Sequence, residues 1–211
     1  MKNKIAIIGY GDLGKQFHDF LKEDSNNEFI FFDDIAFKHD APRIFPYLSY
    51  SIDDYADFSF YVALGYHHLP IKCKVIHHLK SLQRKLPSFI HGSTFINPTA
   101  SVGNGSFIYP MCNIDSNVNI GQGVLLNNSI CISHETNIGE GCYISPGVII
   151  SGKVDIGENT FIGAGSIITN NISIGKNVIV GVGSIVTNNL PDDCSAIGNP
   201  IRILGSKLNL L

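Results

Sequence analysis

Residues 114–137 read IDSNVN IGQGVL LNNSIC ISHETN, four six-residue units that each begin with isoleucine or leucine. The same spacing continues in both directions along the chain, always on isoleucine, valine or leucine. The repeated positions are Ile90, Ile96, Val102, Ile108, Ile114, Ile120, Leu126, Ile132, Ile138, Ile144, Ile150, Ile156, Ile162, Ile168, Ile174, Val180 and Val186. An aliphatic residue at every sixth position predicts short stacked strands that share one core.

The residues around each repeated aliphatic fit the same interpretation. A small or β-branched residue often stands two places earlier, as Thr136 does before Ile138, and alternation along a strand turns both side chains inward. Glycine often follows the aliphatic, where the chain must turn sharply. This pattern resembles the hexapeptide repeat, in which three units form one triangular coil of a parallel β-helix. The resemblance implies a left-handed helix in which residues three repeats apart stack on one another.

The segment ahead of the repeat predicts a small α/β domain. Residues 5–9 are an apolar strand that leads into a glycine-rich loop and a helical pattern. Residues 29–32 and 58–64 predict two further strands, and a second helical pattern follows the last of them. We therefore expect a half-Rossmann-like βαβαβ domain over residues 1–88 and a β-helix domain with a C-terminal tail over residues 89–211.

The glycine-rich loop indicates a phosphate site. A G-x-G-x-x-G pattern lies between a strand and a helix, and an acidic pair ends the next strand, which is the context that this motif requires. Only half of a dinucleotide fold is present, so a nucleotide-sugar is favoured over NAD as the ligand. The alternative is that the loop binds no ligand and its glycines only tighten the turn. The candidate substrate-binding residues are Gly9, Gly11, Asp12, Leu13, Asp33, Asp34 and Gly65.

Composition restricts the classes of partner. The chain is 44% hydrophobic and 16% charged, with a net charge of −3 and no cluster of lysine and arginine. This argues against a nucleic-acid partner or an electrostatic membrane anchor. The first apolar stretch is too short for a signal-peptide core or a membrane span, so a cytoplasmic location is expected. The five cysteines form no C-x-x-C pair, which favours buried, reduced thiols.

His134 is the candidate catalytic base, because every other histidine lies at or before His91. Neutral imidazole, with an ordinary pKa of about 6.5, can remove a proton from an amine or hydroxyl that attacks a thioester. Glu135 follows at once and can hold the other ring nitrogen. Gly152 lies three repeats further on, one full coil, so it stacks at the same corner, and its N–H is a candidate donor to the developing oxyanion.

The whole chain resembles the bacterial sugar O- and N-acetyltransferases, a family that includes sialic acid O-acetyltransferases and the nucleotide-sugar N-acetyltransferases of the bacillosamine pathway. The resemblance begins at the glycine-rich first loop. It continues through FFDD at 31–34, VALG at 62–65, IH at 90–91, NPTA at 97–100, HE at 134–135 and GNP at 198–200.

The resemblance implies acetyl-CoA as co-substrate and a homotrimer with each active site between adjacent β-helices. It implies that Asn127 lies near His134, that Gly152 meets the acetyl carbonyl, and that the backbones of Ala164 and Val182 hold the pantetheine arm. The loop with Asp33 and Gly65 would take the nucleotide. Leu13 and Tyr143 depart from the family, since many relatives have histidine there, at positions that face the acceptor or the acetyl group.

Several alternatives stay open. A metal-dependent hydratase of the carbonic anhydrase type needs about three histidines in the β-helix, but residues 92–211 contain only His134. No metal site is therefore expected. A non-enzymatic sensor or scaffold that binds a nucleotide-sugar is a second alternative. Within acetyl transfer, the domain with Asp33 and Asp34 favours a nucleotide-linked amino sugar, such as a 4-amino-4,6-dideoxyhexose for a surface polysaccharide of the O-antigen type. A hydroxyl of sialic acid or another sugar is the runner-up.

Overall fold

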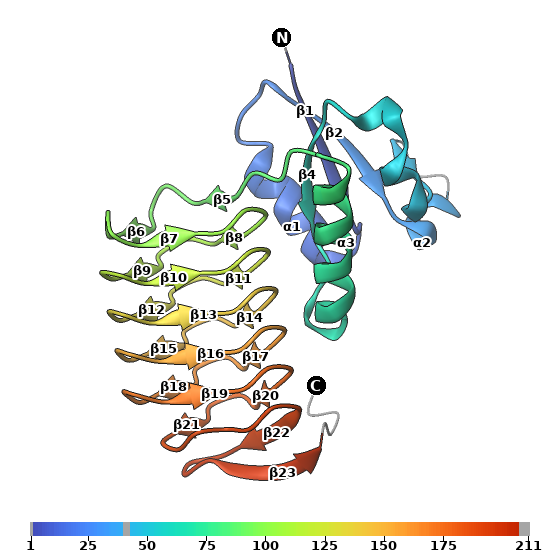
Figure 1. The fold of residues 1–211 in the computed structure, drawn as a ribbon. Helices are drawn as coiled ribbons and strands as arrows, with labels where there is room; N and C mark the ends of the chain where they lie inside the picture. Colours follow the sequence, from blue (N-terminus) through green and yellow to red (C-terminus); the bar gives the residue numbers. More distant parts are fainter. Residues whose placement is uncertain (1, 40–42, 207–211) are drawn as a thin grey trace. The chain divides into compact units, whose positions relative to one another are not determined.

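The computed structural model describes residues 2–39 and 43–206, and the chain divides into two compact units, Met1–Pro87 and Ser88–Leu211 (Figure 1). The C-terminal tail predicted for the second domain lies partly outside the described residues. Among those residues no helix is long and apolar enough to cross a membrane.

The first unit is a four-stranded parallel sheet with helices around it. The strands lie in the order β3-β2-β1-β4. They are β1 (Asn3–Ile8), β2 (Asn27–Phe32), β3 (Ile44–Phe45) and β4 (Ser59–Val62). The helices are α1 (Asp12–Leu21), α2 (Asp34–Phe37), α3 (Leu69–Ser81) and the 3₁₀ turns η1 (Tyr47–Ser51), η2 (Asp53–Tyr55) and η3 (Tyr66–His68).

One part of this unit differs from the predicted βαβαβ order. The second crossover, between β2 and β4, holds only the four-residue α2 and two 3₁₀ turns in place of a full helix, and it adds the short strand β3 at the sheet edge. A two-residue strand is too short to produce a periodic pattern, which is why the sequence did not reveal it. The buried side chains of Phe32, Phe60 and Leu79 form the core beneath these strands.

The second unit is a parallel β-helix whose strands, two residues long except for the last two, form three sheets (Figure 1). The aromatic sheet contains β5 (Phe89–Ile90), β8 (Phe107–Ile108), β11 (Leu125–Leu126), β14 (Tyr143–Ile144), β17 (Phe161–Ile162), β20 (Ile179–Val180), β22 (Cys194–Ile197) and the antiparallel β23 (Arg202–Ser206). The aliphatic sheet contains β6 (Phe95–Ile96), β9 (Asn113–Ile114), β12 (Cys131–Ile132), β15 (Ile149–Ile150), β18 (Ile167–Ile168) and β21 (Ile185–Val186). The polar sheet contains β7 (Ser101–Val102), β10 (Asn119–Ile120), β13 (Asn137–Ile138), β16 (Asp155–Ile156) and β19 (Ser173–Ile174). Each name refers to the side chains on the outer surface of the sheet.

The register confirms the coil length inferred from the repeat. Asn119 pairs with Asn137 in the polar sheet, and Cys131 pairs with Ile149 in the aliphatic sheet, so strands three repeats apart are neighbours. The second residue of nearly every strand points inward and is buried, as Ile132 is. The predicted fold class, an α/β domain followed by a left-handed parallel β-helix, is therefore confirmed.

Buried hydroxyl groups connect successive coils. The Oγ1 atom of Thr136 donates to the carbonyl oxygen of Ser151 at 3.1 Å and accepts the N–H of Val154 at 3.3 Å. Ser106 and Thr160 make the same two contacts at equivalent places in their own coils. Each hydroxyl satisfies two main-chain groups that the next turn of the chain would otherwise leave without partners.

Replacing Thr136 with valine should lower the free energy of unfolding by about 1–3 kcal/mol, because the variant leaves the Ser151 carbonyl and the Val154 N–H buried without partners. Denaturant unfolding followed by circular dichroism measures this change. Thr187→Val is the matched control, since Thr187 is exposed and its substitution should change stability by less than about 0.5 kcal/mol. Equal midpoints for the two variants would contradict the structural role of this hydroxyl.

Candidate active site

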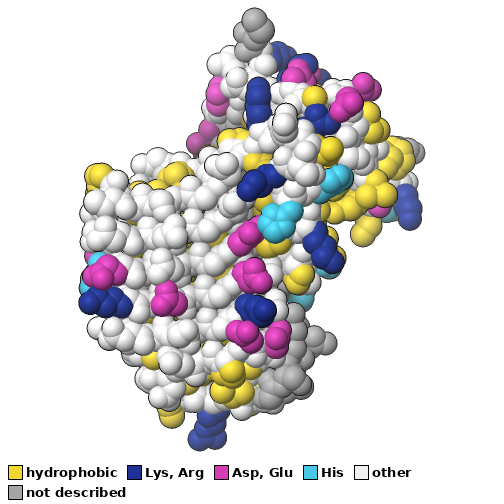
Figure 2. All heavy atoms as spheres, in the orientation of Figure 1, with side chains coloured by type: hydrophobic (Ala, Val, Ile, Leu, Met, Phe, Trp, Pro, Cys, Tyr) yellow, Lys and Arg dark blue, Asp and Glu magenta, His cyan; other side chains and the backbone are white. Residues whose placement is uncertain are grey.

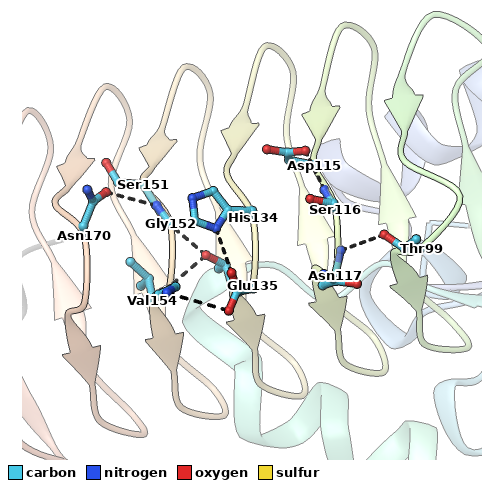
Figure 3. Close-up of polar contacts among 12 residues, drawn as sticks. Thr99, Asp115, Ser116, Asn117, His134, Glu135, Ser151, Gly152, Val154 and Asn170 are labelled. Carbon is cyan, nitrogen blue, oxygen red and sulfur yellow. Dashed lines mark hydrogen bonds and ion pairs between the residues drawn. The ribbon is translucent and has the colours of Figure 1, made fainter.

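His134 lies at the corner between the aliphatic and polar sheets. It follows Ile132, the inward residue of β12, by two positions, and the chain then turns toward β13. Because alternation sends Ile132 into the core, the corner residues face outward, and 49% of the His134 side chain is exposed. Figure 3 shows the imidazole on the outer surface of the coil, beside Gly152.

Glu135 holds one nitrogen of the imidazole. The Nδ1 atom of His134 lies 3.2 Å from Glu135 Oε1 (Figure 3). The other carboxylate oxygen of Glu135 lies 4.0 Å from the Nζ atom of Lys153. A carboxylate accepts only, so the contact with His134 places the proton on Nδ1 and leaves Nε2 as the free, basic nitrogen. Glu135 and Lys153 both adopt a positive φ, 57° and 59°, at the sharp turn of their coils.

Gly152 lies directly against the free nitrogen. A Cβ atom at residue 152 would be 2.6 Å from His134 Nε2, so only glycine allows the imidazole this position. The prediction that these two residues meet at one corner is therefore confirmed in geometry. The Gly152 N–H is already engaged, however, because it donates to Asn170 Oδ1 at 3.1 Å. Any carbonyl oxygen that accepts this N–H has to replace the asparagine.

The remaining β-helix candidates lie at another corner of the same chain. Asn127, Ala164 and Val182 follow strands β11, β17 and β20, so they line the corner between the aromatic and aliphatic sheets. One chain therefore does not bring Asn127 to His134, because the width of the aliphatic sheet separates the two corners. Val182 is 65% exposed, which is unusual for a large apolar side chain.

Tyr143 lies on the outer side of the aromatic sheet. Its ring is 5.7 Å from that of Phe161, one coil further along. Burial and, secondly, the neighbouring Tyr143 raise the pKa of Tyr109 in this cluster, so the Tyr109 phenol stays neutral. Tyr143 is thus packed among aromatic rings and is not in the corner of His134.

The glycine-rich loop of the first unit combines two kinds of glycine. Gly9 has a φ of 100°, and a Cβ there would lie 2.8 Å from the carbonyl oxygen of Ala63, so this residue is needed for packing. A Cβ at Gly14 would overlap the carbonyl of Gly9. Gly11 and Gly65 have open space at the corresponding position, and Gly11 is the N-cap residue immediately before helix α1. Asp12 and Leu13 occupy the first turn of that helix.

The acidic pair organises the backbone. Asp33 Oδ2 accepts the N–H of Tyr10 at 2.9 Å, and Oδ1 accepts the N–H groups of Ile35 and Ala36 at 3.0 and 2.9 Å. Asp34 Oδ1 accepts the N–H of Tyr47 at 2.8 Å. Both carboxylates therefore shape the loops around the strand ends, and a ligand would meet Asp33 as part of a preformed wall.

A hollow of about 340 Å³ opens beside this loop. The Nζ atom of Lys15 lies 5.8 Å from the centre of the Tyr10 ring, next to the N-terminus of α1, where it would face an anionic group. The residues that line the hollow are Tyr10, Gly11, Lys15, Asp33, Ile35, Ala36 and His39.

Sequence reasoning missed several of these contacts. Lys153 and Asn170 each lie one coil beyond a predicted site residue, Glu135 and Gly152 respectively, so the same stacking rule could have found them. Tyr10 and Lys15 carried no signal beyond their nearness to the glycine loop. Within residues 2–39 and 43–206 no group of three or more histidine, cysteine, aspartate or glutamate side chains is placed to hold a metal ion.

The chain is similar to one protein-family model and to several solved structures. A family model described as the GMPPB C-terminal domain matches residues 90–190, and no curated protein matches the chain. The acetyltransferase domain of PglB from Neisseria gonorrhoeae FA1090, in complex with acetyl coenzyme A, is 26% identical with a TM-score of 0.85 over 97% of this chain and 100% of that chain. PerB from Caulobacter crescentus, in complex with CoA and GDP-perosamine, is 25% identical with a TM-score of 0.87 over 96% and 98%. WeeI from Acinetobacter baumannii AYE, at 23% identity and a TM-score of 0.84 over 96% and 100%, shares the fold.

Proposed function

We propose that this chain, a member of the bacterial sugar acetyltransferases built on the left-handed β-helix, transfers an acetyl group from acetyl-CoA to the amino group of a nucleotide-linked amino sugar. The observation that carries the proposal is the contact between His134 and Gly152, which places a basic nitrogen and a main-chain donor at one corner. The likeness to the PglB domain with acetyl-CoA, and to PerB with CoA and GDP-perosamine, supports the two substrates.

The geometry suits attack on a thioester. The amine nitrogen forms a bond to the acetyl carbon while Nε2 of His134 takes its proton. The carbonyl oxygen becomes negative and is stabilised by the N–H of Gly152. The C–S bond then breaks, and the imidazolium returns the proton to the CoA thiolate. Glu135, at 3.2 Å from Nδ1, stabilises the positive ring during these steps.

The two substrates would occupy different parts of the chain. By resemblance, the backbones of Ala164 and Val182 hold the pantetheine arm, and Asn127 and Tyr143 face the acceptor. The hollow beside Gly11, Lys15 and Asp33 suits the nucleotide, since a helix N-terminus and a lysine favour a diphosphate. The sugar we propose is a 4-amino-4,6-dideoxyhexose destined for a surface polysaccharide.

A homotrimer would complete this site. The outer surface of the aliphatic sheet carries Cys131, Ile149, Ile167 and Ile185, whereas the polar sheet carries serine, asparagine and aspartate. Figure 2 shows few hydrophobic side chains on the face formed by the polar sheet. An exposed aliphatic stripe favours an interface. If three copies turn this sheet toward a common axis, the His134 corner of one copy meets the Asn127 corner of the next.

The test is release of free CoA from acetyl-CoA against a panel of nucleotide-linked 4-amino sugars, with free sialic acid for comparison. We expect turnover of one amino sugar and a loss of activity in acid, because the attacking amine must be unprotonated. Activity on sialic acid alone would change the assignment to O-acetylation. No turnover with any acceptor would favour a sensor or scaffold that binds the nucleotide-sugar.

A further inference from the structure

The peptide group of Gly152 is held on both sides by the next coil. Its carbonyl oxygen accepts the N–H of Asn171 at 3.1 Å. Its own N–H donates to the side-chain Oδ1 of Asn170, also at 3.1 Å (Figure 3). Gly152 is buried, whereas Asn170 is exposed to solvent. The asparagine amide thus covers a donor that the fold otherwise leaves pointing outward.

Only one of these two bonds belongs to the architecture of the β-helix. At this corner the ladder runs through the N–H groups of Glu135, Lys153 and Asn171, which donate to the carbonyl groups of the preceding coil. Two N–H groups that each stand one residue before the ladder position of their coil are instead met by side chains. Ser116 N–H donates to Asp115 Oδ1 at 2.6 Å, and Gly152 N–H donates to Asn170. Removing the Asn170 bond would therefore leave the coil intact.

We propose that Asn170 is a displaceable cap on the Gly152 N–H, which the acetyl carbonyl oxygen replaces when acetyl-CoA binds. The inference rests on the proposed function, because it takes Gly152 as the donor to that oxygen. The exposed asparagine side chain can rotate away into solvent, and the donor next to His134 Nε2 then becomes free. While the site is empty, the cap prevents this buried N–H from losing its hydrogen bond.

The cap also determines whether the Gly152 hydrogen bond contributes to the binding of acetyl-CoA or to the later step from the bound complex to the transition state. On binding, a bond to a neutral amide oxygen is exchanged for a bond to a neutral thioester oxygen, so little affinity is gained. In the transition state the same oxygen is negative, and a charge-assisted hydrogen bond is stronger. Because the cap is already displaced in the bound complex, Asn170 weakens binding of the ground state and of the transition state equally, so it raises the Kd of acetyl-CoA and leaves kcat unchanged.

Two substitutions with opposite expected effects test the cap. Asn170→Ala frees the donor and should lower the Kd of acetyl-CoA by about two- to tenfold, with kcat within about twofold of wild type. Asn170→Asp provides a charged acceptor that holds the N–H more tightly, so the Kd of acetyl-CoA should rise by about tenfold. CoA has no acetyl carbonyl, and its Kd should not change in either variant. Titration calorimetry with acetyl-CoA and CoA, together with steady-state kinetics, measures these differences.

Asn188→Ala is the matched control, because Asn188 occupies the same corner one coil further along and contacts only Thr187 in the described contacts. A fall in kcat of tenfold or more in Asn170→Ala would overturn the proposal by placing Asn170 in the chemistry. Equal changes in the Kd of acetyl-CoA and CoA, or no change in either, would also overturn it. A wild-type protein that binds neither compound would contradict the proposed function itself, before any variant is made.

Discussion

His134→Ala is expected to lower the rate of acetyl transfer by about 10²–10⁴-fold, the contribution that a positioned general base makes to proton transfer. The variant removes the basic nitrogen that lies against Gly152, so the attacking amine loses the acceptor for its proton. Stability should change little, because half of the His134 side chain is exposed and the neighbouring coil contacts it through a glycine. The release of CoA and the unfolding midpoint measure the two effects separately.

The matched control for this experiment is His91→Ala. His91 belongs to the same unit and is half-buried, and its Nδ1 atom lies 2.9 Å from Ser93 Oγ. His91→Ala should keep the turnover and the unfolding midpoint of the wild type. A His134→Ala variant with near wild-type turnover would remove His134 from the mechanism.

Ile149→Lys is expected to separate the copies of the proposed trimer and to abolish most of the activity. Ile149 is 44% exposed on the outer surface of the aliphatic sheet, between Cys131 and Ile167. A lysine in this stripe, close to its own copies around a threefold axis, would be desolvated beside like charges. Each His134 corner would then lack the Asn127 corner of the neighbouring copy. The rate of acetyl transfer should fall by about 10²-fold or more, as expected when one side of an active site is misplaced.

Sedimentation gives the oligomeric state, since a trimer has three times the 23.0 kDa mass of one chain. Ser173→Lys introduces the same charge on the exposed polar sheet and should remain trimeric and active. If Ile149→Lys stays trimeric, the aliphatic sheet is not the interface. If it becomes monomeric but keeps its activity, the site is complete within one chain and the shared arrangement is wrong.

The sequence alone was sufficient for the β-helix and for the meeting of His134 with Gly152. A six-residue period requires every coil to have the same length, so a spacing of three repeats translates directly into stacking. The order of the first unit was predicted less completely, because β3 and α2 are too short to produce a periodic pattern. The roles of Asp33 and Asp34 in holding backbone N–H groups were likewise not visible in the acidic pair itself.

The repeat specifies the position of each residue along the coil, because that position depends on spacing alone. The direction and the partner of each corner side chain came from the three-dimensional structure. Asn170 could have pointed into solvent, but its amide oxygen bonds to Gly152 N–H. Asn127 is close to His134 in the sequence, yet the aliphatic sheet lies between their corners. Corner side chains are free of the core packing that enforces the repeat, so their contacts depend on rotamers and on neighbours that spacing does not specify.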